Sequence, residues 1–164
     1  LYIHLGVNTM NKYSQVFFTS IILSSLIALT GCSSNAPILG VDNGQLTPCP
    51  DKPNCVNSFA EDEAHHINPI VSKGSDGVVK NNILNVINSL ENSKVTATES
   101  RYVRAEFTSD LFGFVDDVEF YFPESSMNQT TIHVRSASRL GYSDFNVNRE
   151  RVESLRLKLE ALEK

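Results

Sequence analysis

Residues 94–138 constrain the fold most, because apolar and polar side chains alternate there with a period of two. The alternation is interrupted by short polar or glycine-bearing connections, which leave four segments at about 94–99, 101–108, 114–122 and 130–138. A period of two is typical of strands with one buried face. We therefore predict that the four segments form an antiparallel sheet.

The same alternation separates an apolar face from a charged face. In the second segment, Val103, Ala105 and Phe107 point one way, and Arg104 and Glu106 point the other. The later segments add further charges to the face of Arg104, namely Asp117, Glu119 and Arg135. Opposite charges on neighbouring strands favour cross-strand ion pairs.

Two amphipathic helices flank the predicted strands. The first spans about 76–90, is capped by Ser75 or Asp76, and has apolar residues at helical spacing. The second spans about 147–162, capped by Asp144 or Asn146, with one apolar stripe: Val152, Leu155, Leu159 and Leu162. With a possible extra strand near 65–71, residues 49–164 predict one α+β domain. It has an antiparallel sheet of four to five strands and two helices packed on one face.

An apolar run at residues 16–29 ends at Leu29-Thr30-Gly31-Cys32. This ending resembles the lipobox of bacterial lipoproteins, in which cleavage leaves an acylated cysteine at the new amino terminus. We expect residues 1–31 to be a signal peptide that starts at Met10, preceded by an upstream extension, and Cys32 to carry the lipid. The alternative is a membrane-spanning or buried helix. A spanning helix needs about 20 apolar residues, and the run at residues 16–29 is shorter.

The residues after Cys32 have consequences for location and redox state. Ser33 favours the outer membrane, facing the periplasm, and residues 32–48 lack periodicity, which predicts a flexible tether. In an oxidising compartment, Cys49 and Cys55 should form a disulfide. A thiol redox pair is an alternative, and so is a zinc site with His65 or His66, although no second ligand pair has the usual spacing.

The charge balance and the absent motifs limit the function classes. The formal net charge is −5 and no basic run is present, which argues against nucleic acid as a partner. The sequence has no phosphate-binding glycine loop, no serine-hydrolase elbow and no metal-binding His-Glu-x-x-His motif. We therefore expect no cofactor and no bound metal.

Three longer segments carry a family resemblance. They read CPDKPNCVNS, RAEFTSDLFGFVDDVEFYF and IHVRSASRLGYSDFNVNRERVESLR. Together they resemble the domain-of-unknown-function family 1499, here as a bacterial lipoprotein member, from Cys49 to the end of the chain. Asn146 departs from a position where the family usually has glycine. The resemblance implies a fold and a set of marked positions, but no reaction.

The marked positions define the candidate site. They are Asp116, Asp117, Glu119, Arg135, Ser136, Arg139, Asp144, Asn148 and Arg149. The charged face could be a solvated surface, or a polar groove in which Arg135 is a bidentate donor to an anionic or hydroxyl-rich ligand. A third interpretation is catalysis by Asp117 and Glu119 with His133 as proton shuttle.

Asp116 and the corner before the last helix have their own interpretations. Asp116 lies on the apolar face, so it needs a partner, which we expect in the turn at residues 138–141. The alternative is a perturbed carboxylate in a cleft. At the corner, Asp144 can cap the helix and Arg149 can reach back.

These observations predict a lipid-anchored envelope protein with a non-catalytic binding module. Its partner would be an envelope protein, a glycan or a small ligand, held by the charged face or by the corner at residues 139–149. The alternative is a hydrolase-like enzyme with a carboxylate-arginine site. A carrier of lipid or of a small apolar ligand is the third hypothesis, and it needs a cavity between the helices and the sheet.

Overall fold

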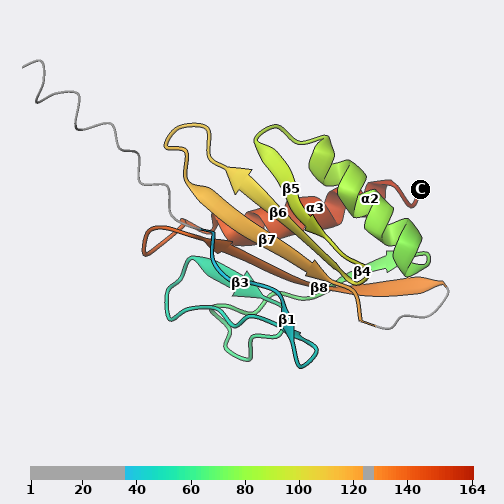
Figure 1. Ribbon diagram of the computed structural model, residues 1–164, viewed down its shortest axis with the longest axis horizontal. Helices are drawn as coiled ribbons and strands as arrows, with labels where there is room; N and C mark the ends of the chain where they lie inside the picture. The colour runs from blue at the N-terminus through green and yellow to red at the C-terminus, as the bar shows by residue number, and fades with distance from the viewer. Residues whose placement is uncertain (1–35, 124–127) are drawn as a thin grey trace, which may run out of the picture. The chain divides into compact units, whose positions relative to one another are not determined.

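The computed structural model describes residues 36–123 and 128–164, so the predicted signal peptide and Cys32 lie outside the described residues. Figure 1 shows the element order. The elements are β1 (Val41–Asp42), β2 (Gln45–Leu46), β3 (Cys55–Asn57), β4 (Ile70–Lys73), α2 (Asp76–Asn88), β5 (Ser93–Thr98), β6 (Tyr102–Thr108), β7 (Val115–Tyr121), β8 (Gln129–Ser138) and α3 (Val147–Ala161). In these described parts, no helix is long and apolar enough to cross a membrane.

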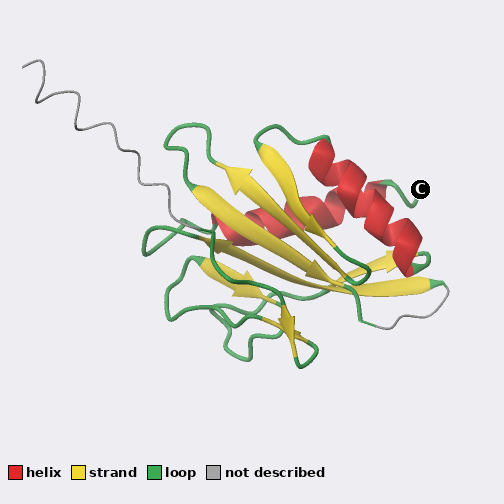
Figure 2. Cartoon of the chain, viewed as in Figure 1, coloured by secondary structure: helices red, strands yellow, loops and turns green. Residues whose placement is uncertain are grey.

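The main sheet has six strands, and its strand pairs are antiparallel (Figure 2). The order is β3-β8-β7-β6-β5, and β4 also pairs with β8. The ten-residue β8 accommodates both partners, because β4 pairs with its first half and β3 with residues 135–137. The predicted α+β class is confirmed, but the predicted count of four to five strands is too low. The three-residue β3 is too short to show an alternation.

One apolar core joins both helices to the strands. Four residues of the predicted apolar stripe of α2 are buried: Val79, Ile83, Val86 and Ile87. Its fifth residue, Leu90, follows the end of the helix and is only partly buried. In α3 the stripe ends earlier than predicted, because Leu162 is 56 % exposed beyond the last helical turn. Ser75 is the N-cap of α2, as predicted, but its side chain makes no capping hydrogen bond.

The predicted tether over residues 32–48 is wrong from Ala36 onward. A hairpin of β1 and β2 occupies residues 41–46, and Leu46 is only 2 % exposed. Asn43 and Gly44 form its turn with φ of 49° and 77°. Positive φ at both central residues is the requirement of a type I′ turn, and Asn-Gly is its preferred sequence. This pair was the sequence signal for the hairpin.

The predicted disulfide between Cys49 and Cys55 is confirmed. It ties the segment that follows the hairpin to β3, which pairs with β8. Closing a loop of about 7 residues stabilises the folded state by roughly 2.4 kcal/mol in the chain-entropy treatment.

We expect the Cys49→Ala/Cys55→Ala double variant to lose about 2 kcal/mol of unfolding free energy. Urea unfolding under oxidising conditions measures the loss. A reductant should lower the wild-type midpoint and leave that of the double variant unchanged. Equal midpoints for the two oxidised proteins would contradict the prediction.

Candidate functional site

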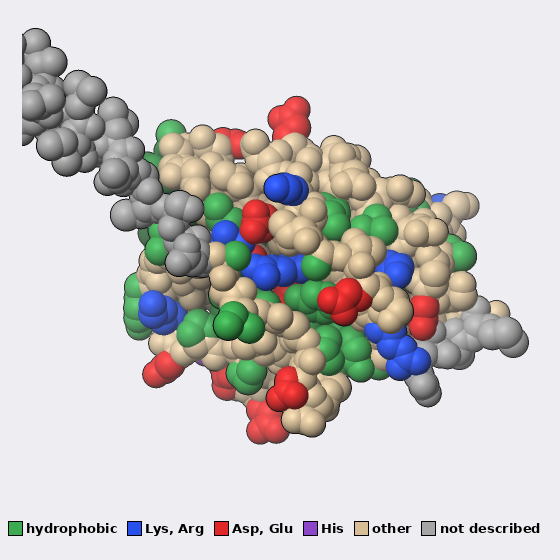
Figure 3. All heavy atoms as spheres, viewed as in Figure 1, with side chains coloured by type: hydrophobic (Ala, Val, Ile, Leu, Met, Phe, Trp, Pro, Cys, Tyr) green, Lys and Arg blue, Asp and Glu red, His purple; other side chains and the backbone are tan. Residues whose placement is uncertain are grey.

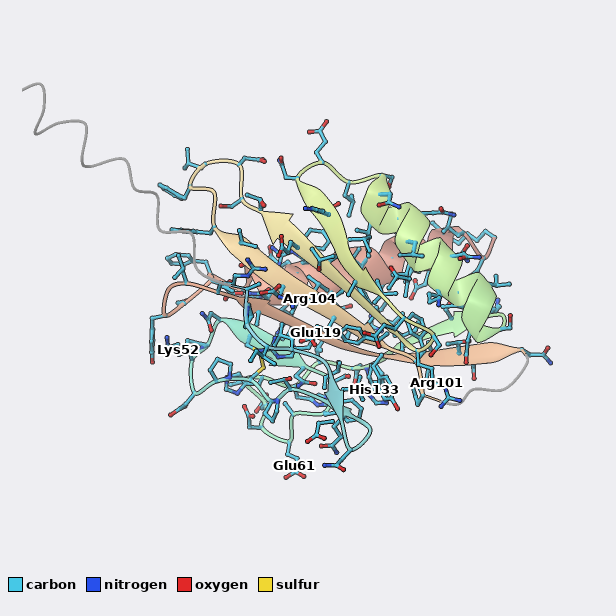
Figure 4. All side chains as sticks on the ribbon, in the orientation of Figure 1. Lys52, Glu61, Arg101, Arg104, Glu119 and His133 are labelled. Carbon is cyan, nitrogen blue, oxygen red and sulfur yellow. A yellow bond between two sulfur atoms is a disulfide. The ribbon has the colours of Figure 1, made fainter. Side chains whose placement is uncertain are left out.

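The charged face is assembled by the register of β6, β7 and β8. Arg104 lies opposite Glu119, and Glu119 lies opposite Arg135. Figure 4 shows Arg104 and Glu119 on these strands, and Figure 3 shows acidic and basic side chains intermixed on this side of the molecule. The predicted cross-strand pairing is therefore present, as an Arg104–Asp117 pair and an Arg135–Glu119 pair.

The interpretation of this face as a solvated surface is wrong. Glu119 is fully buried, Asp117 is 1 % exposed and Arg135 is 6 % exposed. The segment that carries the hairpin crosses the face (Figure 1), and Arg104 Nη1 donates to the Pro37 carbonyl at 3.3 Å. We call residues 36–50 the N-terminal layer. Alternation along the strands identified the charges but not the layer above them.

Asp117 is held by two arginines. Arg104 donates to its Oδ1 from Nε and Nη2, at 3.0 and 2.6 Å. Arg139 donates from Nε to Oδ2 at 2.7 Å and from Nη2 to Oδ1 at 2.9 Å, and it also binds Glu106. Burial opposes ionisation of Asp117, but the hydrogen bonds and charges of both arginines outweigh it and lower its pKa. Asp117 is therefore an ionised acceptor and a poor proton donor.

Glu119 has a different set of partners. It accepts a hydrogen bond from the Tyr102 hydroxyl at 2.8 Å and one from Arg135 Nη1 at 3.2 Å. Burial raises the pKa of Glu119, although Tyr102 and Arg135 oppose the shift. Burial also lowers the pKa of Arg135, and Glu119 partly compensates. Glu119 and Arg135 have thus lost their hydration on folding, and the ion pair between them compensates for part of that loss.

One nitrogen of Arg135 is buried without a partner. Within residues 36–123 and 128–164, its buried Nε has no hydrogen-bond partner. Arg135 also lines a cavity of about 350 Å³ together with Asp117 and Arg139. Residues 37–39 and 47–50 of the N-terminal layer line the same cavity. The charged face and the N-terminal layer thus line an open pocket that a small molecule could occupy.

His133 is not placed to move protons for the two carboxylates. Its Nδ1 lies 3.0 Å from the Ser58 hydroxyl, and its ring stacks on Phe59 with centroids 3.9 Å apart. The hydrogen bonds of Asp117 and Glu119 are to arginine and tyrosine instead. The structure gives no support to the proton-shuttle interpretation.

Burial lowers the pKa of His133 below its usual value. The unfolded chain therefore binds a proton at a higher pH than the folded chain, and stability should fall as the pH drops below about 6.5. We expect thermal unfolding to occur at lower temperature at pH 5.5 than at pH 7.5, and the His133→Gln variant to show a smaller difference. An unchanged difference in the variant would assign the pH dependence to another group.

Asp116 lies on the opposite face from Asp117 and has a partner that was not predicted. Its Oδ2 accepts a hydrogen bond from Arg151 Nη2 of α3 at 2.5 Å, instead of one from the turn at 138–141. The Arg151 guanidinium also lies 5.1 Å from the centre of the Phe107 ring. Asp116 therefore does not join Asp117 and Glu119 in a single carboxylate site.

The remaining candidates build the corner between β8 and α3. Fully buried Asn148 is its centre, with hydrogen bonds to Asn54, Ser136, Ser138, Asp144 and Arg151. The predicted capping by Asp144 is confirmed, because its carboxylate accepts from the amides of Asn146 and Asn148 at 3.1 and 2.8 Å.

Arg149 reaches back to the segment that precedes β4. It donates to the carbonyls of His66 at 2.7 Å and Ala64 at 3.0 Å. His65 itself binds Asp62 at 2.7 Å. In the described part of the chain, no three His, Cys, Asp or Glu side chains gather as a metal ion would require.

A family described as "Protein of unknown function (DUF1499)" matches residues 45–159, from β2 to α3. The chain belongs to the DUF1499 family. A search of curated proteins finds no match to it. The match covers the charged face and the corner of this DUF1499 protein. Asn146 has a φ of 73°, a left-handed conformation that suits glycine and is tolerated by asparagine.

Proposed function

We propose that this DUF1499 protein is a lipoprotein of the bacterial outer membrane, anchored through Cys32 and facing the periplasm. Its domain is a non-catalytic module that binds a small ligand on the charged face. Residues of both helices share one apolar core with the strands, whereas the charged face and the N-terminal layer line the cavity. The lipobox-like sequence supports the anchor, and the cavity supports the binding role.

The unused Nε of Arg135 is the observation that carries the binding proposal. A buried donor without a partner costs about 1–3 kcal/mol. The Nε is itself covered, so the Arg135 guanidinium, which lines the cavity, would have to turn slightly to bond a ligand oxygen there. Arg139 and Asp117 line the same cavity, so a ligand would also meet other polar groups there. A cavity of about 350 Å³ is at the small end of the usual range for ligand sites.

The charge balance narrows the ligand class. The arginines Arg104, Arg135 and Arg139 are matched by three carboxylates: Glu106, Asp117 and Glu119. The cavity therefore offers directed donors but little excess positive charge. This favours a small hydroxyl-rich molecule with a single carboxylate over a highly charged phosphate compound.

The geometry favours binding over hydrolysis. Asp117 accepts four hydrogen bonds from two arginines and has a lowered pKa, so it is unsuited to act as an acid. Glu119 is fully buried beneath Tyr102 and Arg135. The two arginines occupy the acceptor positions of Asp117, and the burial of Glu119 keeps water away from it.

Replacement of Arg135 by lysine tests the binding role. Lysine keeps a positive charge for Glu119 but lacks Nε and the planar fork. We expect glucuronic acid to bind the wild-type chain more tightly than glucose does, and Arg135→Lys to weaken binding at least 10-fold. Titration calorimetry measures both affinities, and thermal unfolding confirms that the variant folds.

Arg156→Lys on α3 is the matched control, because Arg156 binds carbonyls away from the cavity. It should bind like the wild type. Equal affinities of Arg135→Lys and the wild type for glucuronic acid would contradict the proposal. So would a wild-type protein that binds none of the three probes acetate, glucuronic acid and glucose.

The anchor is tested separately with Cys32→Ala. The wild-type chain should fractionate with membranes and yield an amino-terminal peptide that carries acyl mass on Cys32. The variant should lose both properties. An unmodified Cys32 in the wild-type protein would contradict the lipoprotein assignment.

A further inference from the structure

One end of the sheet carries an exposed apolar surface. The β6–β7 connection and the β8–α3 connection lie together at this end (Figure 2). We call their exposed apolar residues the loop-end patch: Leu111, Phe112, Phe114, Leu140, Tyr142, Phe145 and Val147. Five of the seven also line one cavity of about 240 Å³, so the two connections are direct neighbours.

The aromatic residues of the patch are held outward. Phe145 is 90 % exposed, and its φ of 53° is uncommon for a residue with a large side chain. Phe112 and Phe114 stack on each other with ring centroids 5.5 Å apart, yet both remain exposed. Contiguous exposed apolar surface of this kind marks a site of contact with a protein or a membrane.

The first described residues of the chain lie near the same end of the sheet. The Pro37 carbonyl is fixed to Arg104, and Pro37 shares a cavity with Ser138. Ser138 also lines the cavity of the loop-end patch. Cys32 is five residues before Pro37, so the connecting chain can span at most about 18 Å. A lipid on Cys32 would hold this end of the sheet close to the bilayer.

We infer that the loop-end patch inserts into the membrane interface beside the lipid anchor. The inference rests on the proposed lipidation of Cys32. Phenylalanine, tyrosine and leucine are suited to the boundary between head groups and acyl chains. Residues 109–114 and 140–147 contain no lysine or arginine and two acids, Asp110 and Asp144. Contact with lipid would therefore depend on apolar burial and not on the charge of the head groups.

The absence of tryptophan from the chain allows a direct test. Phe145→Trp and Phe112→Trp each place one fluorophore in the patch. Val71→Trp is the matched control, because Val71 is exposed and pairs with Thr131 toward the other end of β8. Each acylated full-length variant is reconstituted into phosphatidylcholine vesicles with or without brominated acyl chains, after circular dichroism has confirmed its fold.

We expect brominated lipid to reduce the emission of both patch variants at least twofold and to leave Val71→Trp unchanged. Replacing part of the lipid by an anionic one, or adding salt, should not alter the quenching. Equal quenching at all three positions would overturn the inference, as would no quenching in the patch.

Two further outcomes would contradict insertion of the loop-end patch into the membrane. A blue-shifted Phe145→Trp emission that ignores brominated lipid, in a chain that sediments as a dimer, would assign the patch to a second copy. Mass spectrometry of the Cys32 peptide separates the two proposals. An acylated Cys32 with an unquenched patch overturns the inference alone, whereas an unmodified Cys32 overturns the anchor and the inference together.

Discussion

Replacing Arg135 with methionine should lower the free energy of unfolding by about 3–5 kcal/mol. Methionine fills much of the space of the arginine stem, but it leaves Glu119 fully buried without its cationic partner. Tyr102 would remain as the donor to Glu119 and cannot neutralise the charge. Urea unfolding of the variant and the wild type measures the difference.

Two controls separate the lost ion pair from lost packing. Adding Glu119→Gln to Arg135→Met removes the buried charge and should recover part of the loss. Glu153→Gln breaks the Arg156–Glu153 pair, in which Glu153 is half-exposed, and should cost less than about 1 kcal/mol. A loss below about 1 kcal/mol for Arg135→Met would show that Glu119 is not dependent on this partner.

The Asn148→Ala variant should lose about 3 kcal/mol, the second-largest effect. The substitution leaves the buried Ser136 hydroxyl proton without its acceptor. It also removes one of the two hydrogen bonds to the Asn54 carbonyl, which keeps the bond from the Ser138 amide. Each unsatisfied buried group costs about 1–3 kcal/mol. Urea unfolding again measures the loss, and the m-values of the variant and the wild type should be equal.

Asn146→Gly is the matched control for the corner. It lies two residues away, has left-handed backbone and makes no side-chain capping bond. Glycine adopts this conformation without strain, so we expect a change below about 1 kcal/mol. Equal effects at Asn146 and Asn148 would mean that the corner does not depend on the Asn148 amide.

The four predicted strands and two helices agree with β5 to β8, α2 and α3. In long segments, the period of the apolar residues distinguishes a strand from a helix. The boundaries differ by one or two residues, as for the helix predicted over 76–90 and found at Asp76–Asn88. Shorter elements were not predictable in this way. β1 and β2 have two residues each, and only the Asn43-Gly44 turn indicates them.

The candidate site was predictable as a set of charges but not as an environment. Alternation placed Asp117, Glu119 and Arg135 on one face of the sheet. A solvent-exposed face and a face covered by another layer show the same alternation, so the sequence pattern could not distinguish them. The partner of Asp116 depends on how α3 crosses the sheet, which brings Arg151 over Phe107. Helical periodicity gives the buried stripe of α3 but not its direction across the strands.

The N-terminal layer also has a mechanical consequence. Tension on the chain before Ala36 would enter the domain at Pro37, whose carbonyl is held by one exposed hydrogen bond from Arg104. Such a bond contributes about 1 kcal/mol, whereas buried Leu46 secures the hairpin behind it. Tension would therefore detach residues 37–39 from the charged face first, and the detachment would end at the β1–β2 hairpin. These residues line the Arg135 cavity, so lifting them would remove part of its wall.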